Sequence, residues 1–169
     1  MNNASGPLPV VLVTGTSSGI GLAVIRRLRD HPGFRVIATS REASLPRLAA
    51  EGFQDTDRFL VRPLDVTNAQ DRLRVVREAE NRWGGIDLLI NNAGISYRSV
   101  VEHMTEEEEQ RQMATNYFGA MALIRLVLPG MRERKNGRII NISSVSGMMA
   151  MPTMSSYSAS KFALEGACE

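Results

Sequence analysis

The hydrophobic residues of this chain gather in short continuous runs, and longer amphipathic stretches separate these runs. The first run, VVLVTG at residues 10–15, is rich in β-branched residues and ends in glycine. A run of this kind, without alternating polar positions, is typical of a strand that is covered on both faces. The sequence predicts five such strands, at residues 10–15, 34–41, 58–66, 86–94 and 137–144.

The stretches between these strands have the spacing of helices. One stretch follows the first strand, and its apolar positions are Ile20, Ala23, Val24 and Leu28. Another follows residue 104, and its expected buried face is Met113, Ala120, Met121, Ile124 and Leu128. A further helix, predicted from Ser156 onward, ends the chain.

Polar residues mark where two of the helices begin. Thr67 or Asn68 is placed to cap the helix before Trp83, and two glycines at 84–85 follow its end. Thr105 and Glu108 form a capping-box pattern. The acidic run at 106–109 then falls where a helix dipole favours negative charge, so we interpret it as a helix start and not as a binding patch.

Strands alternate with helices along the whole chain, which predicts an α/β fold with a parallel sheet and helices on both faces. The 169 residues suit one domain, and 43% hydrophobic residues are enough for a sizeable core. The net charge of +2 does not indicate nucleic-acid binding. No apolar run has the length of a membrane span, so none is expected.

The remaining composition excludes several classes of site. Cys168 is the only cysteine, so no internal disulfide is possible, and we expect a cytoplasmic protein without a signal peptide. His31 and His103 lack metal-ligand spacing, and we expect no metal.

A glycine-rich stretch, TGTSSGIG at 14–21, joins the first strand to the first helix. Gly15 allows a sharp turn, Gly19 leaves room for a pyrophosphate, and Gly21 lets the helix pack closely on the sheet. The free N–H groups of the helix start and the hydroxyls at 16–18 can bind phosphate. A plain tight turn is the alternative, but the strand–turn–helix context favours a Rossmann-type, doubly wound dinucleotide-binding fold.

The second strand ends in Ser40 and Arg41 instead of the carboxylate that would bind the ribose of NAD. An arginine at this point can pair with a 2′-phosphate, so we predict NADP as the cofactor, with NAD still possible. The adjacent Glu42 and the alternative of a solvated Arg41 charge leave this choice open.

Six features occur in one order: TGTSSGIG, LDV at 64–66, NNAG at 91–94, Asn116, Ser144 and YSASK at 157–161. Together they resemble the short-chain dehydrogenase/reductase family, in its compact single-domain subgroup. SSGIGLA and YSASKFALEG are most similar to the 17β-hydroxysteroid and retinol dehydrogenase branch. The resemblance implies an oxidoreductase that acts on a small alcohol or ketone and, in a full-length form, a homo-oligomer.

The resemblance also implies roles for individual residues. The phosphate loop would consist of Gly15, Ser17, Ser18, Gly19 and Ile20. Asp65 would bind the adenine amino group beside Val66. Asn91, Ala93 and Gly94 would shape the adenosine side of the cleft. The catalytic residues would be Asn116, Ser144, Tyr157 and Lys161, of which the last two also contact the cofactor.

Elementary chemistry agrees with these roles. A free phenol has a pKa of about 10 and is a poor base at neutral pH, but a nearby ammonium group stabilises the phenolate. Tyr157 and Lys161 are four residues apart and share one helix face. Ser144 can bind the substrate oxygen, or it can be a capping hydroxyl. Asn116 would hold a water that links Lys161 to solvent.

Family members continue well past Lys161, whereas this chain ends at Glu169. We therefore expect residues 1–169 to be a single NAD(P)-binding Rossmann domain that is incomplete at its C-terminus, with strands one to five present and later strands missing. The fifth strand would then be an apolar sheet edge without a partner.

The leading hypothesis is an NADP-preferring oxidoreductase that transfers hydride between nicotinamide and a secondary alcohol or ketone, with Tyr157 as acid and base. The alternative is a non-catalytic nucleotide-binding or assembly fragment that lacks the substrate half. A sugar-nucleotide epimerase fits less well, because its glycine loop has a different spacing.

Overall fold

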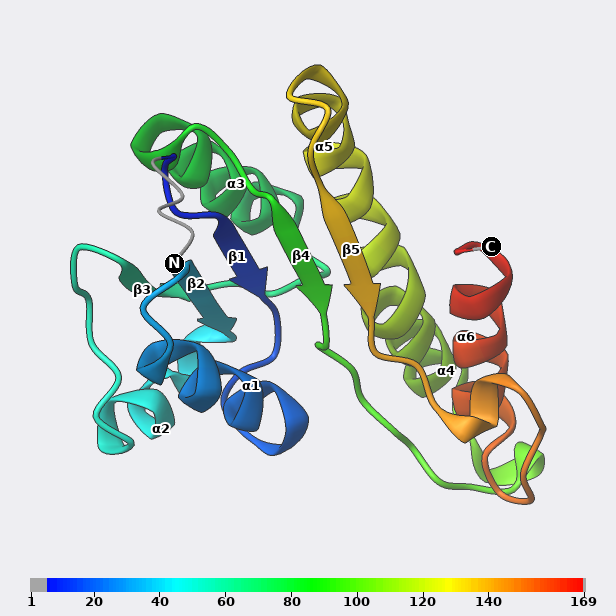
Figure 1. The fold of residues 1–169 in the computed structure, drawn as a ribbon. Coiled ribbons are helices and arrows are strands. Elements are labelled where there is room, and N and C mark those ends of the chain that lie inside the picture. Colours follow the sequence, from blue (N-terminus) through cyan, green and yellow to red (C-terminus); the bar gives the residue numbers. More distant parts are fainter. Residues whose placement is uncertain (1–5, 169) are drawn as a thin grey trace.

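A computed structural model describes residues 6–168, which form one parallel sheet with helices on both faces (Figure 1). The strand order is β3-β2-β1-β4-β5, and every pairing is parallel. The strands are β1 (Val10–Val13), β2 (Arg35–Ser40), β3 (Phe59–Pro63), β4 (Leu88–Asn91) and β5 (Arg138–Asn141). The predicted Rossmann-type sheet of five strands is confirmed.

The helices lie between the strands, as the periodicity predicted. The α-helices are α1 (Gly19–Asp30), α2 (Leu45–Ala50), α3 (Ala69–Trp83), α4 (Glu106–Met113), α5 (Gly119–Glu133) and α6 (Ser155–Gly166). Short 3-10 helices are η1 (Glu42–Ser44), η2 (Val101–His103) and η4 (Val145–Gly147), and η3 (Ala114–Phe118) is a π-helical segment. Of the two candidate caps of α3, Asn68 is the one that binds the helix N–H groups, and the Thr105–Glu108 capping box is present.

The core has two layers because successive residues of a strand point to opposite faces of the sheet. Val10 and Leu12 of β1 pack with α3 and α5, whereas Val11 and Val13 pack with α1 and α2. Both layers exclude water from β1, whose four residues are at most 1% exposed. The expectation of strands covered on both faces is therefore correct for β1.

The expectation is wrong for β5, which lies at the edge of the sheet. Its residues alternate between exposed and half-buried, and Ile140 is 45% exposed. In the described residues β5 pairs only with β4. The exposure of Arg138 and Ile140 shows that one face of β5 lacks the cover that was expected for the strand at 137–144.

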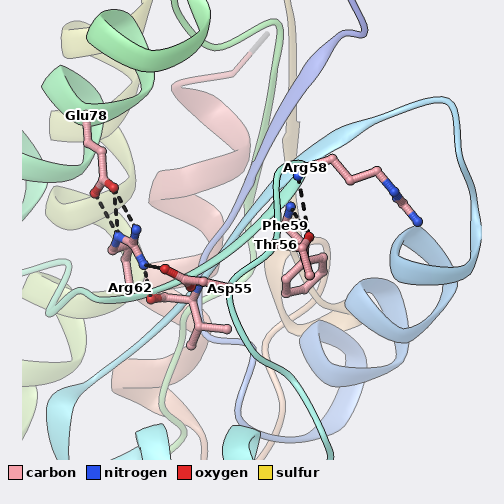
Figure 2. Close-up of polar contacts among 7 residues, drawn as sticks. Asp55, Thr56, Arg58, Phe59, Arg62 and Glu78 are labelled. Carbon is pink, nitrogen blue, oxygen red and sulfur yellow. Dashed lines mark hydrogen bonds and ion pairs between the residues drawn. The ribbon is translucent and has the colours of Figure 1, made fainter.

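The opposite edge, β3, is closed by its own preceding loop (Figure 2). The carboxylate of Asp55 accepts the Val61 N–H at 2.9 Å, and the Thr56 N–H donates to the Phe59 carbonyl at 2.7 Å. Arg62 is held between Asp55 and Glu78, with nitrogen–oxygen distances of 2.7 and 2.8 Å. These contacts occupy backbone groups that would otherwise pair with another strand.

Two helix faces differ from prediction. In α1 the buried residues are Gly21 and Ile25, while Ile20 and Ala23 are exposed, and Ile20 lines a cavity at the strand ends. In α5 the buried residues include Leu123 and Val127, whereas Met121 and Leu128 are only partly buried. The π-helical η3 between α4 and α5 has more residues per turn than an α-helix, so the buried side of α5 is rotated relative to that of α4.

Candidate active site

A cavity of about 420 Å³ lies at the carboxyl ends of the strands, where open parallel sheets bind ligands. The chain segments that follow β1, β2, β3, β4 and β5 all contribute to its wall, and α6 closes one side. The predicted residues in its lining are Gly15, Ser17, Ser18, Ile20, Arg41, Asp65, Val66, Ala93, Gly94, Tyr157 and Lys161. A wider groove of about 640 Å³ on α3 contains none of the predicted residues.

The strands are shorter than predicted, and the residues that follow them form part of the cavity wall. Residues 64–66, 92–94 and 142–144 were expected in strands but follow β3, β4 and β5 as irregular chain. Backbone that leaves a sheet frees its side chains and N–H groups for a ligand. The motifs LDV and NNAG therefore reach the cavity from just beyond their strands.

The glycine loop has the backbone shape that was predicted for it. Gly15 and Gly19 have φ angles of +69° and +57°, in the left-handed region that favours glycine. A methyl group at Gly21 would overlap the Gly15 carbonyl oxygen, so the close packing of α1 requires glycine here. Nothing lies within 4 Å of the position that a Cβ at Gly19 would take.

This loop fits a pyrophosphate. Ser18 is the N-cap residue of α1, but its side chain makes no capping bond, so the first N–H groups of the helix have no side-chain acceptor. The open space at Gly19 lies beside these donors. A helix start with free N–H groups and a positive dipole end is an anion site.

Asn92, which the sequence did not single out, holds the glycine loop in place through hydrogen bonds to Thr14 and Gly15. Its Nδ2 donates to the carbonyl oxygens of Thr14 and Gly15, both at 2.9 Å, and its N–H donates to Thr14 Oγ1 at 3.0 Å. Asn92 lines the cavity, whereas Asn91 is 5% exposed, lies outside the lining and donates to Asn141 at 2.8 Å. The two residues differ because neighbouring side chains of an extended chain point in opposite directions.

Charged groups surround the part of the cavity beyond β2 and β3. Burial of the Asp65 carboxyl raises its pKa, but hydrogen bonds from the Thr67 hydroxyl and N–H, with the charges of Arg41 and Arg111, hold the pKa below its usual value. Asp65 is therefore a carboxylate at neutral pH and can accept from an amino group. Arg111 on α4 also lines the cavity, and nothing in its spacing along the sequence pointed to it.

Tyr157 and Lys161 lie one turn apart on α6, and both reach the cavity. Lys161 Nζ lies 5.9 Å from the centre of the Tyr157 ring and donates to the Ile142 carbonyl at 2.7 Å. Burial lowers the pKa of Lys161, and the nearby Glu165 charge opposes this shift. The lysine is 5% exposed, which is rare for an amine without a buried carboxylate partner.

The other two predicted catalytic residues lie outside the cavity lining. The Ser144 hydroxyl accepts the Ser146 N–H at 3.1 Å and so caps η4, while the neighbouring Ser143 lines the cavity. Asn116, in η3, is 2% exposed. Its Oδ1 accepts the Ile95 N–H at 2.8 Å, and its Nδ2 donates to the Ile95 carbonyl and to Ser160 Oγ.

Within residues 6–168 no cluster of three or more His, Cys, Asp or Glu residues could hold a metal ion. No helix among the described residues is both long enough and apolar enough to cross a membrane.

Comparison with known proteins shows what this chain is similar to. The sequence model of the short chain dehydrogenases matches residues 9–169. The 3-ketodihydrosphingosine reductase of Bacteroides thetaiotaomicron is 39% identical over 160 residues, which are 95% of this chain and 56% of that protein. The 3-oxoacyl-[acyl-carrier-protein] reductase FabG of Vibrio cholerae is 36% identical over 157 residues, which are 93% of this chain and 63% of that protein.

A solved short-chain dehydrogenase from Streptomyces avermitilis has the same fold. It superimposes with a TM-score of 0.84 at 38% identity, over 94% of this chain and 58% of that one. The chain thus spans a little over half the length of the relatives that it matches.

Proposed function

Because the chain belongs to the short-chain dehydrogenase family, we propose that it carries the cofactor-binding and catalytic part of an NADP-preferring oxidoreductase. The proposed reaction transfers hydride between nicotinamide and a secondary alcohol or ketone, with Tyr157 as acid and base. One observation carries the proposal: Tyr157 and Lys161 line the same cavity as the glycine loop, Arg41 and Asp65.

The cavity residues fit a dinucleotide in one order along the strand ends. The loop at 15–20 would hold the pyrophosphate at the start of α1. The Asp65 carboxylate would accept from the adenine amino group, and Arg41 would pair with the 2′-phosphate that distinguishes NADP. Arg111, which faces the same region as Arg41, adds positive charge there.

Bound NADP would supply the hydride acceptor or donor. The chain's own task is then to move one proton at the substrate oxygen and to hold that oxygen in place. Tyr157 would donate its phenolic proton to a ketone oxygen, or accept the proton of an alcohol. The cationic form of Lys161 would stabilise the phenolate that remains.

We propose that Ser144 binds the substrate oxygen, although its hydroxyl caps η4 and Ser144 lies outside the cavity lining. The hydroxyl oxygen accepts the Ser146 N–H, and the hydroxyl proton stays available as a donor. A donor fixed in this way is suited to stabilise negative charge on the oxygen.

The contacts of Asn116 support a positioning role. Its amide holds Ile95 in the cavity wall and bonds Ser160, whose hydroxyl donates to the Tyr157 carbonyl at 2.7 Å. Asn116 thereby connects the segment after β4 with the helix that carries Tyr157. A water relay from Lys161 through Asn116 stays a prediction.

The names of the relatives favour a ketone as the oxidised substrate. One relative is a 3-keto reductase and another is a 3-oxoacyl reductase. We propose the same functional group here, and a homo-oligomer in the cytoplasm for the whole protein. The free thiol of Cys168 is consistent with a reducing compartment.

The test combines binding and turnover. Fluorescence titration should give a lower Kd for NADPH than for NADH, and NADPH oxidation with a panel of ketones should depend on Tyr157. Tyr157→Phe should abolish turnover and leave NADPH binding within about threefold, since it removes only the phenolic hydroxyl and keeps the ring. Tight binding without turnover of any substrate would favour the nucleotide-binding fragment instead.

A further inference from the structure

Gln112 is a buried polar residue that the proposed reaction does not use. It is 0% exposed, and its Oε1 accepts the N–H of Tyr97 at 2.6 Å. It lies in α4, four residues before Asn116, so the two amides occupy one helix face. Both amides bind the segment that follows β4, Gln112 at Tyr97 and Asn116 at Ile95.

The two contacts have matching spacings on the helix and on the segment that follows β4. Gln112 and Asn116 lie about one turn apart across the junction of α4 and the π-helical η3, and the two N–H groups that they bind are two residues apart. Alternate N–H groups of an extended chain point to the same side. The next such group, the N–H of Ser99, donates to the Thr153 carbonyl at 3.0 Å. Residues 95, 97 and 99 are therefore fixed along one side.

This segment borders both the cavity and α6. Ile95 and Ser96 line the cavity, and Ser99 pairs with Met154, the residue before α6 begins. Tyr157 lies in the first turn of that helix. A shift of the segment at Tyr97 would thus move the cavity wall and the start of the helix that carries Tyr157.

The second half of the Gln112 amide lacks a partner. Its Nε2 is buried without a hydrogen bond among the described residues, and so is the Ser156 hydroxyl on α6. One turn further along each helix, the equivalent pair is joined, because Asn116 Nδ2 donates to Ser160 Oγ at 3.0 Å. The helices α4 and α6 pack together and run in the same direction (Figure 1). The Asn116–Ser160 bond therefore aligns Gln112 with Ser156, which lie four residues earlier on the two helices.

We propose that Gln112 is a positioning residue of this active site, which holds the segment 95–99 and the first turn of α6 through Tyr97 and Ser156. The contact to Tyr97 is the observed one, and the free Nε2 donor is matched by the free Ser156 acceptor. Buried donors and acceptors without partners are rare in folded proteins, and a bridging water would satisfy both. The consequence for catalysis rests on the proposed function, whereas the backbone contact does not.

The test begins with amide hydrogen exchange followed by NMR on the intact chain. Gln112→Met keeps the shape of the side chain and removes the acceptor oxygen, so exchange at Tyr97 should accelerate about tenfold. Gln112→Glu keeps an acceptor and should restore protection to within about threefold. The control Gln110→Met alters an exposed glutamine of the same helix that bonds only Glu106, and Tyr97 exchange should not change.

Catalysis provides the second measurement. Gln112→Met should lower kcat about tenfold and change the Kd for NADPH less than about twofold, because Gln112 is not among the residues that line the cavity. Ser156→Ala should add little to the effect of Gln112→Met if the two residues act together.

Two results would overturn the inference. One is equal Tyr97 exchange in Gln112→Met and the parent protein, and the other is equal acceleration in Gln110→Met. If the proposed function fails instead, every protein lacks turnover but the exchange rates still separate Gln112→Met from Gln110→Met.

Discussion

Gly21→Ala gives a sharp test of how the glycine loop is built. The added methyl group would overlap the Gly15 carbonyl oxygen and lie 2.5 Å from Asn92 Nδ2, closer than side-chain carbons come to such atoms. The carbonyl belongs to backbone, so relief requires either α1 or the Asn92 amide to move. Movement of Asn92 breaks its two 2.9 Å bonds to the carbonyls of Thr14 and Gly15.

The magnitude follows from these contacts. If the Asn92 amide moves, the loss of its two hydrogen bonds costs about 1–3 kcal/mol together. If it stays, the close contact is not fully relieved, and this overpacking costs about 1–3 kcal/mol instead. Alanine is a better helix former than glycine by at most about 1 kcal/mol. We expect a net loss of about 1–3 kcal/mol in the free energy of unfolding, or a Tm lowered by about 3–10 °C for a chain of this size.

The assay is thermal and urea unfolding followed by circular dichroism. Gly166→Ala is the matched control, since nothing lies within 4 Å of the methyl group that it adds near the end of α6. The control should be as stable as the parent protein or slightly more stable. If Gly21→Ala also equals or exceeds the parent in stability, the close contact between α1 and the loop is not what the structure describes.

Three further predictions concern the cofactor and the sheet edge. Gly19→Ala fills the open space at the start of α1, so the affinity for NADPH should fall by at least about tenfold. The free energy of unfolding should fall by only about 1 kcal/mol, because alanine is strained in the left-handed backbone conformation of this position. An unchanged affinity in a titration would contradict the phosphate site. Arg41→Ala should weaken NADPH at least about tenfold and NADH less than about twofold, and equal effects on both would remove the argument for NADP. Asp55→Asn should lower the free energy of unfolding by at most about 1 kcal/mol at pH 7, because the ion pair with Arg62 is half exposed. Burial raises the pKa of Asp55, but the Val61 N–H and Arg62 hold this pKa below its usual value. The carboxylate therefore stabilises the fold above the pKa of the unfolded state, and the free energies of unfolding of the two proteins should converge when urea titrations are run below about pH 4. A difference that stays constant with pH would show that ionisation is not involved.

The strands and their order of appearance could be predicted from the sequence because β1 is apolar throughout, and β2 and β4 contain apolar runs that are buried between two layers of helices. The ends of β3 and β5 could not be predicted, since Leu64 and Ile142 continue the apolar runs but belong to the walls of the cavity. An apolar residue that lines a cavity and one that lies in a strand look alike in a hydrophobic pattern.

The missed residues have equally specific causes. Asn92 and Arg111 act through positions in space that no sequence spacing reveals, the first beneath the glycine loop and the second beside Asp65. The buried face of α5 differs from the predicted face because the π-helical segment η3 precedes α5. Asn116 in η3 makes tertiary contacts that stabilise this segment. Local propensity carries no signal for such a segment.

The central claim is that Tyr157 acts on a substrate held in the cavity that binds NADPH. Its most direct test is the rate of NADPH oxidation with a ketone panel, for the parent protein and Tyr157→Phe, beside the Kd for NADPH of both. We predict turnover in the parent, loss of at least about a thousandfold in Tyr157→Phe, and nearly equal Kd values. Equal turnover in the two proteins would contradict the assignment of Tyr157 as acid and base.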